Sequence, residues 1–196
     1  QVYRNPVIYR QKRQKEIIYT EEQKIAIRKF SGDYDRKIYK TYLLYGVTGS
    51  GKTEVYMEMI AKVLNDGRQA IVLIPEIALT YQTVMRFYTR FGERVSILNS
   101  RMSQGERYDQ MERVKKGEVD IMIGPRSALF TPFEKLGLIV IDEEHEPTYK
   151  SEQVPRFHAR ETAIERARME GASVVLGSAT PSLEAFYACE CGRYPA

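Results

Sequence analysis

Residues 43–53 read Leu-Leu-Tyr-Gly-Val-Thr-Gly-Ser-Gly-Lys-Thr, and this stretch decides the fold expected for the rest of the chain. From Gly46 to Thr53 it matches the pattern G-x-x-x-x-G-K-[ST] without a gap. An apolar run at 42–45 precedes the pattern, and apolar residues at helical spacing follow it at Val55, Met59, Ile60, Val63 and Leu64. The order strand, glycine-rich loop, helix is the context that the pattern requires. The stretch therefore predicts a site for a nucleoside triphosphate.

The residue types of this loop suit a phosphate chain. Glycines let backbone N–H groups turn inward and approach phosphate closely, and a helix beginning near Lys52 adds the positive end of its dipole. We expect Lys52 to neutralise the β- and γ-phosphates and Thr53 to ligate Mg²⁺. A glycine-rich turn with a chance lysine is the alternative, and the correct flanks argue against it. The expected nucleotide-binding residues of the loop are Gly46, Thr48, Gly49, Ser50, Gly51, Lys52 and Thr53.

Composition indicates one globular α/β domain preceded by a basic segment. The chain has 196 residues, 43% hydrophobic and 29% charged, which is ordinary for a folded domain. Residues 1–40 hold 11 Lys and Arg against 5 Asp and Glu, whereas the whole chain has a net charge of only +4. We interpret residues 1–18 as a basic linker or arm and residues 19–196 as the domain. A basic segment suits a polyanionic partner, but it is also typical of a solvated linker.

Cysteine content and apolar runs bear on the compartment. The two cysteines, Cys189 and Cys191, are too few to staple a fold, and C-x-C alone does not make a zinc site. This favours a reducing interior, most simply the cytoplasm. No apolar stretch is long enough to span a bilayer, and no signal peptide is recognisable, so we expect no membrane association.

Hydrophobic periodicity then alternates between strand and helix along the chain. Thr20 with Gln23 forms a capping-box pattern that starts a helix, which we expect to end at Ser31–Asp33. We expect residues 41–45 to form a central strand. Further strands are predicted at 70–74, 95–98, 121–123, 138–141 and 173–176, and helices at 52–65, 79–91, 103–116, 160–170 and from 182 onward. Five or six parallel strands with intervening helices predict a three-layer α/β/α domain.

Polar and glycine-containing segments follow most of these strands. Besides the phosphate loop they are Pro75-Glu76, 124–126, 142–145 and 177–180. Because ligands bind at the carboxyl ends of parallel strands, we expect these segments to share one edge of the sheet. Asp142 would hold Mg²⁺ through water, and Glu143 would orient and deprotonate an attacking water molecule. An ordinary strand that ends in a charged turn is the alternative for this pair.

Several segments together resemble a known helicase family. Asp142-Glu143-Glu144-His145 and Ser178-Ala179-Thr180 are similar to motifs II and III of superfamily 2 helicases. With 46–56, 74–80, 126–130 and 177–182, they resemble the PriA (primosomal protein N′) family of bacterial replication-restart helicases. The stretch from Asp142 to Arg160 is similar to the aromatic-rich loop of that family. The resemblance covers the chain from about Thr20 onward and implies the first RecA-like, P-loop NTPase lobe.

The resemblance implies roles for further residues. Gln23 lies where the family has an adenine-reading glutamine, although it could instead serve only the capping box. Thr80 and Arg126 would grip single-stranded DNA, with a plain surface charge as the alternative for Arg126. His145 and Thr180 would link hydrolysis to strand separation, unless His145 is simply a satisfied core histidine. Tyr149 and Phe157 would stack on bases or detect DNA, unless they are merely packed.

The resemblance also implies partners and a wider activity. Such proteins are ATP-driven helicases that move 3′ to 5′ and restart stalled forks, so ATP or ADP, Mg²⁺, and single-stranded and forked DNA are expected ligands. Primosome loading proteins, single-strand-binding protein and a bacterial cytoplasm are implied as well. We expect a second RecA-like lobe with an arginine finger, and the family's zinc sites, to lie beyond Ala196 rather than in this chain.

Two other hypotheses remain open at this point. The first is a nucleotide-binding interaction module without catalytic activity, against which Glu143 argues because such a module needs no water-activating acid. The second is a different superfamily 2 translocase, against which the aromatic-containing loop at 149–160 argues. On the leading hypothesis, these 196 residues bind nucleotide but hydrolyse it slowly, because the arginine finger is absent.

Overall fold

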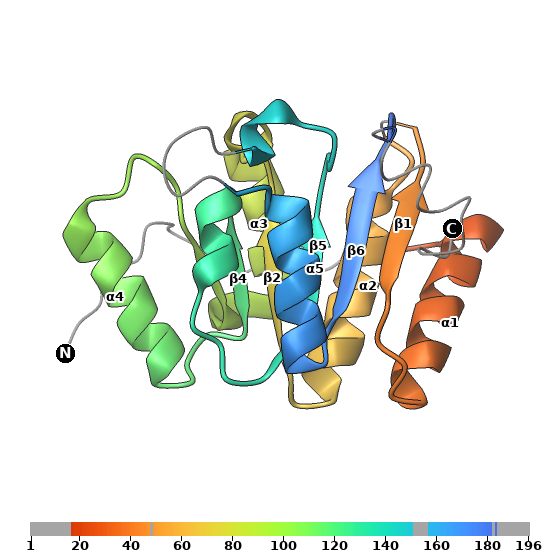
Figure 1. Cartoon of the computed structure of the whole chain (residues 1–196), viewed down its shortest axis with the longest axis horizontal. Helices are drawn as coiled ribbons and strands as arrows, with labels where there is room; N and C mark the ends of the chain where they lie inside the picture. The colour runs from red at the N-terminus through yellow and green to blue at the C-terminus, as the bar shows by residue number, and fades with distance from the viewer. Residues whose placement is uncertain (1–16, 48, 151–156, 182, 184–196) are drawn as a thin grey trace.

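The computed structural model describes residues 17–47, 49–150, 157–181 and 183, and these form a six-stranded, entirely parallel sheet between two helical layers (Figure 1). The strand order is β1-β6-β5-β2-β4-β3. The strands are β1 (Thr41–Tyr45), β2 (Gln69–Leu73), β3 (Val95–Ile97), β4 (Ile121–Gly124), β5 (Leu136–Ile141) and β6 (Ser173–Ser178). The main helices are α1 (Glu21–Asp35), α2 (Lys52–Asn65), α3 (Tyr81–Phe91), α4 (Gln104–Lys115) and α5 (Ala159–Glu170). The expected α/β/α class is confirmed.

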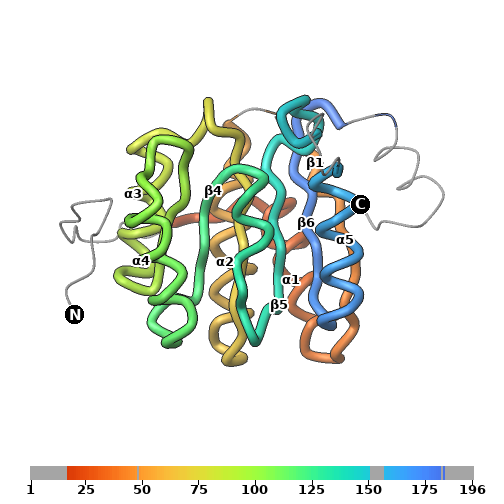
Figure 2. Tube along the Cα trace, turned by 60° about the vertical axis from the view of Figure 1, so that its left-hand side comes forward, coloured from red at the N-terminus to blue at the C-terminus, as the bar shows by residue number. Residues whose placement is uncertain are grey.

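Alternation along the strands separates the core into two layers. Val72 of β2 and Val140 of β5 pack in one hydrophobic cluster with side chains of α1, α2 and α3. Their neighbours Ile71 and Ile139 pack in the second cluster, which α4, α5 and the 3-10 helix η3 (Arg126–Phe130) cover. The central strands are buried on both faces, as their continuous apolar runs predict. Figure 2 shows the helices on either side of the sheet after a 60° turn.

Two sequence-based expectations about the first elements are wrong. Helix α1 does not end at Ser31–Asp33 but continues to Asp35, because Asp33 and Tyr34 are buried in its last turns. The Asp33 carboxylate accepts hydrogen bonds from Tyr42 and Lys40, which keep a polar side chain satisfied inside the structure. Strand β1 lies at one edge of the described sheet rather than in its centre.

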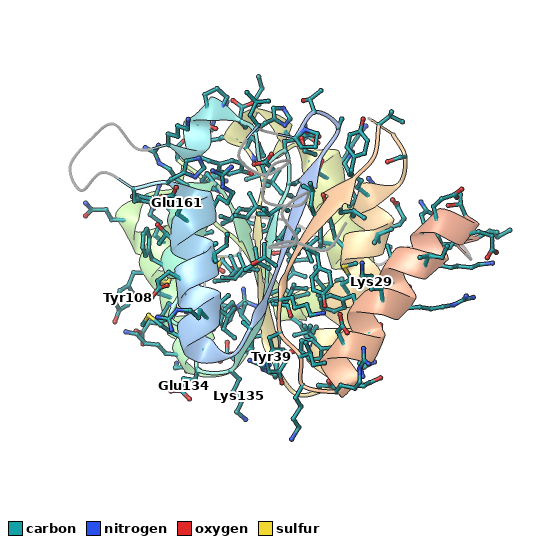
Figure 3. All side chains as sticks on the ribbon, turned by 45° about the vertical axis from the view of Figure 1, so that its right-hand side comes forward. Lys29, Tyr39, Tyr108, Glu134, Lys135 and Glu161 are labelled. Atoms are coloured by element: carbon teal, nitrogen blue, oxygen red, sulfur yellow. The ribbon has the colours of Figure 1, made fainter. Side chains whose placement is uncertain are left out.

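The loops at the amino ends of the strands form the edge opposite the phosphate loop. Tyr39, Glu134 and Lys135 belong to this edge and are labelled in Figure 3. The Arg68 guanidinium ties the edge together, because it donates to the carbonyl oxygen of Gly171 at 2.7 Å and lies 5.0 Å from the Tyr39 ring centre. Among the described residues, no helix is both long and apolar enough to cross a membrane.

Two glycines provide a matched test of this packing. A β-carbon at Gly137 would overlap the Tyr34 hydroxyl and lie 2.8 Å from Val63 Cγ1, whereas one at Gly32 would meet nothing within 4 Å. Gly137→Ala should therefore lower the free energy of unfolding by about 1–3 kcal/mol through overpacking. Gly32→Ala, within α1, should raise it by roughly 0.5–1 kcal/mol. Urea denaturation of both variants checks this, and equal effects would contradict the packing described.

Candidate nucleotide-binding and hydrolysis site

The candidate site lies where β1, β6 and β5 end side by side. The parallel ladder continues past the strands into the functional loops. Gly46 N–H donates to the carbonyl oxygen of Ser178 at 3.2 Å, and Glu144 N–H donates to that of Gly177 at 3.0 Å. The phosphate loop, the 142–145 segment and the 177–180 segment are thereby fixed next to one another. Their location at the carboxyl ends of the strands is the expected ligand-binding edge.

The phosphate loop has the backbone that its glycines predict. Gly49 and Gly51 both have φ of 80°, a conformation in which a side chain is strained. Helix α2 begins at Lys52 without a side-chain cap, so its N-terminal N–H groups and dipole are available to an anion. The Lys52 ammonium donates to the carbonyl oxygen of Gly46 at 2.7 Å, which holds it over the loop. Thr48 lies outside the described residues.

Gln23 uses both ends of its carboxamide. Its Oε1 accepts from the Thr20 N–H at 2.9 Å and completes the capping box of α1. Its Nε2 donates to the carbonyl oxygen of Ser50 at 2.8 Å, inside the phosphate loop. A β-carbon at Gly51 would overlap this amide, so Gly51 is required for the contact. The capping-box alternative is therefore present, and the same side chain also braces the loop.

Asp142 is a partly buried carboxylate beside the loop. Its Oδ1 accepts a hydrogen bond from the Tyr56 hydroxyl at 2.9 Å. Burial raises the pKa of Asp142 above its ordinary value, and the charge of Glu143 adds to the rise, whereas the Tyr56 bond and the Lys52 ammonium oppose it. Burial and the nearby carboxylates also raise the pKa of Tyr56 well above its usual range, so its hydroxyl remains a donor.

Glu143, His145, Ser178 and Thr180 form one connected network. Glu143 has φ of 49°, an uncommon left-handed conformation for a residue with a side chain and one that clusters at functional sites. Its Oε2 lies 3.6 Å from His145 Nε2. His145 Nδ1 lies 2.6 Å from Ser178 Oγ, which also accepts from the Thr180 N–H at 3.0 Å. The network physically joins the candidate general base to the end of β6.

A buried ion pair anchors the same loop from the other side. Glu144 is 2% exposed, and its Oε2 accepts from Arg160 Nη1 at 3.2 Å. Arg160 belongs to the first turn of α5, which packs on β5 and β6. Because this ion pair compensates a buried charge, it helps to fix the path of the 142–145 segment.

Tyr149 occupies the core rather than the surface. It is 1% exposed, and its hydroxyl lies 2.6 Å from the carbonyl oxygen of Asp142 and 3.1 Å from that of Leu73. A ring enclosed in this way has no free face for a base, so the stacking expectation for Tyr149 is wrong in this conformation. The Tyr149 hydroxyl instead supports the backbone of Asp142 by donating to its carbonyl oxygen.

Arg126 contacts the predicted aromatic-rich loop at Thr148, Lys150 and Phe157. Arg126 Nη1 donates to the carbonyl oxygens of Thr148 at 3.0 Å and Lys150 at 2.7 Å. Its guanidinium lies 5.9 Å from the centre of the Phe157 ring, which also contacts Phe130 edge-on. Arg126 is therefore more than a plain surface charge, because it ties β4 to the loop after β5.

Among the predicted site residues, Thr80 has a local structural role. It caps α3, and its side chain accepts from the Thr83 N–H at 3.2 Å. It follows β2, at the same edge of the sheet as Arg126, but no contact joins it to the hydrolysis network among the described residues. Cys189 and Cys191 lie outside the described residues.

The oxygen ligands that this site offers fit Mg²⁺ only if phosphate oxygens complete its coordination. Among the described residues, no group of three or more His, Cys, Asp or Glu side chains could hold a metal ion. Mg²⁺ commonly takes one or two protein oxygens plus substrate phosphates. Thr53 follows Lys52 in the first turn of α2, and the Lys52 charge opposes the rise that burial causes in the pKa of Asp142. Thr53 and Asp142 therefore fit a nucleotide-bound Mg²⁺ rather than an independent metal site.

Sequence reasoning missed three residues that build this site. Tyr56 holds Asp142, Ser178 Oγ bridges His145 to Thr180, and Arg160 neutralises Glu144. One signal was present for Tyr56, because it follows Lys52 by four residues and therefore shares its helix face. No local pattern pairs Glu144 with Arg160.

Known proteins match the chain at the level of both sequence and fold. The DEAD/DEAH box helicase family matches residues 20–187. The chain belongs to the DEAD/DEAH box helicase family. Curated relatives include Replication restart protein PriA of Bacillus subtilis (strain 168), 48% identical over 99% of this chain, and that of Haemophilus influenzae (strain ATCC 51907 / DSM 11121 / KW20 / Rd), 42% identical over 97%. The chain spans 24% and 27% of those two proteins.

Solved structures of other helicases share the fold. RecG bound to a three-way DNA junction superposes with a TM-score of 0.64 at 23% identity, over 91% of this chain and 23% of RecG. The Pyrococcus furiosus Hef helicase domain gives 0.55 at 20% identity, over 82% of this chain and 32% of that chain. These similarities confirm a RecA-like helicase fold.

The pKa of Asp142 predicts a pH-dependent cost to stability. A carboxyl whose pKa is higher when folded than when unfolded lowers stability as pH rises through the interval between the two values. Asp142→Asn removes this cost and keeps an oxygen for the Tyr56 hydroxyl. The variant should therefore melt at a higher temperature than the wild type at pH 7, and the gain should shrink under acidic conditions.

Asp33→Asn is the matched control with the opposite sign. Burial alone would raise the pKa of Asp33, but hydrogen bonds from Tyr42, Lys40 and Arg36 bring it below the ordinary value. Its ionised form therefore stabilises the fold above the unfolded pKa, and this contribution is lost as pH falls through the folded value. The variant should melt at a lower temperature at pH 7. Thermal melts of both proteins from about pH 2.5 to pH 8 test the pair, because the Asp33 contribution is lost only below its ordinary pKa, and parallel behaviour would contradict these assignments.

Proposed function

We propose that this chain is the ATP-binding motor lobe of a DNA helicase that restarts stalled replication forks. The observation that carries the proposal is the junction at the ends of β1, β6 and β5, where backbone hydrogen bonds hold the phosphate loop beside Asp142 and Glu143. Membership of the helicase family and the relatives named PriA support a nucleic-acid motor over an inactive binding module.

Each residue of the site has a proposed task in nucleotide hydrolysis. Backbone N–H groups from Gly49 to Thr53 bind the phosphates, and Lys52 neutralises their charge. Thr53 and Asp142, the latter through water, hold Mg²⁺, which when bound neutralises charge on the phosphates. The oxygen of the attacking water bonds to the γ-phosphorus while Glu143 accepts a proton from that water. At the same time the bond from the γ-phosphorus to the ADP oxygen breaks. Gln23, which braces the loop in this structure, is the residue proposed to read the adenine.

Coupling to DNA would run through the contacts described at the strand ends. Thr80 and Arg126 bind backbone phosphates of single-stranded DNA, which makes the interaction independent of sequence. Arg126 transmits this contact to the loop after β5 through its bonds to Thr148 and Lys150. Phe157, stacked near the Arg126 guanidinium, contacts bases. The Glu143–His145–Ser178–Thr180 network links the hydrolysis step to strand separation.

The wider activity is proposed from the same family membership. The motor moves 3′ to 5′ on single-stranded and forked DNA in the bacterial cytoplasm. Primosome loading proteins and single-strand-binding protein are its partners. A second RecA-like lobe contributes an arginine worth about 10³- to 10⁵-fold in rate, so this lobe alone binds nucleotide but hydrolyses slowly.

Lys52→Ala tests nucleotide binding directly in this chain. Because hydrogen bonds to charged groups contribute about 1.5–3 kcal/mol, the variant should bind ADP with Mg²⁺ roughly 10- to 100-fold more weakly. Titration with a fluorescent ADP analogue provides the measurement. Lys62→Ala is the control, because Lys62 belongs to the same helix but pairs with Asp35 and Asp66. Equal affinities of wild type and Lys52→Ala would overturn the phosphate-loop assignment.

Glu143→Gln separates binding from cleavage. In a longer chain that includes the second lobe, the variant should keep its nucleotide affinity but lose about 10²- to 10⁴-fold in ATP hydrolysis, because glutamine cannot accept the proton. DNA-stimulated phosphate release is measured. Glu146→Gln, in the same loop, should retain activity. Normal turnover of Glu143→Gln would show that another group activates the water.

A further inference from the structure

A tyrosine of the phosphate-loop helix reaches the carboxylate at the end of β5. Tyr56 is 1% exposed and lies in the second turn of α2, four residues after Lys52. Its hydroxyl donates to Asp142 Oδ1 at 2.9 Å. One helix therefore presents Lys52 and Thr53 at its start and, one turn later on the same side, a group that contacts the acid.

Strand β6 leaves space for the contact between Tyr56 and Asp142, because it has a glycine at this position. Gly177 of β6 pairs with Leu44 of β1, so β6 separates β1 from β5 at this level. A β-carbon at Gly177 would overlap the Tyr56 hydroxyl and lie 2.7 Å from the ring carbon that bears it. Gly177 is not in the left-handed region, so backbone conformation does not require glycine there. The phenol is the neighbour that excludes a side chain.

A side-chain donor fixes the orientation of the carboxylate. The Asp142 side chain accepts from the Tyr56 hydroxyl. An ionised carboxylate has about four acceptor positions, so this bond leaves capacity for a metal-bound water. Tyr56 is enclosed by the core cluster of α2 and the sheet, which prevents its hydroxyl from following another rotamer of Asp142.

We propose that Tyr56 is a positioning residue of the magnesium–nucleotide site, and that Gly177 lacks a side chain in order to admit it. The hydroxyl holds Asp142 in the orientation that receives a hydrated Mg²⁺ on the nucleotide phosphates. This inference rests on the proposed nucleotide site and adds to it a dependence of metal affinity on a residue that contacts neither nucleotide nor metal. Groups that hydrogen-bond a metal ligand commonly affect metal affinity about 10- to 100-fold.

The test compares Tyr56→Phe with Tyr34→Phe in this chain. Both variants keep a buried ring and lose one hydroxyl, but the Tyr34 hydroxyl bonds at the opposite edge of the sheet, with Arg68 and Gly137. A fluorescent ADP analogue is titrated in EDTA and then over a range of Mg²⁺ concentrations. Tyr56→Phe should leave the affinity in EDTA unchanged and raise the Mg²⁺ concentration for half-maximal enhancement about tenfold or more. Tyr34→Phe should change neither quantity.

Gly177→Ala is a second, independent variant. It retains the phenol but displaces the hydroxyl from Asp142, so it should raise the Mg²⁺ requirement in the same direction. Thermal melts show that each variant is folded. If one of the two does not fold, the other still decides the outcome.

The possible results separate this inference from the proposed function. A wild-type chain that binds no nucleotide with Mg²⁺ would overturn the nucleotide site, and the role of Tyr56 with it. An unchanged Mg²⁺ requirement in folded Tyr56→Phe would overturn only the role of Tyr56. An equal loss of affinity in EDTA and in Mg²⁺ would also overturn it, because that result indicates a general disturbance of the pocket.

Discussion

The placement of β6 between β1 and β5 is the constraint on which the site depends. Each strand pairs in parallel with its neighbour, so the three strands end at the same edge and their following loops meet. Hydrogen bonds from Gly46 and Glu144 to the backbone of β6 extend this order into the loops. The backbone pairing of β1, β6 and β5 positions all three of the loops that follow these strands at once. The side chains then refine what the backbone has already aligned.

Burying polar groups at this edge of the sheet costs free energy of desolvation, which only correctly placed partners offset. Asp142 is partly and Glu144 almost completely removed from water, and each is compensated by a partner from a helix, Tyr56 from α2 and Arg160 from α5. A buried carboxylate without such partners would be strongly destabilising. The two helices that cover opposite faces of the sheet are thus both coupled to the segment that follows β5. A shift of either helix would move Asp142 or Glu144, and with them Glu143, the candidate general base between them.

The differences from expectation have physical causes that sequence patterns do not contain. Gly32 looks like a helix stop, but α1 continues because Asp33 and Tyr34 gain buried partners on the sheet. Strand β1 was expected in the centre but lies at one edge of the described sheet, because strand order is set by crossover connections and not by local composition. Tyr149 looked like a loop aromatic, but hydrogen bonds to backbone carbonyl oxygens draw its ring into the core.

The sequence by itself determined the class of fold, nearly all strand and helix positions and the left-handed glycine backbone of the loop before α2, because hydrophobic period and glycine placement are local properties of the chain. It also marked Asp142 and Glu143 correctly as following a buried strand. Only the tertiary structure decided which groups orient them. Tyr56, Gly177, Ser178 and Arg160 act across distances of many residues, and their partners become neighbours only when parallel strands and covering helices pack.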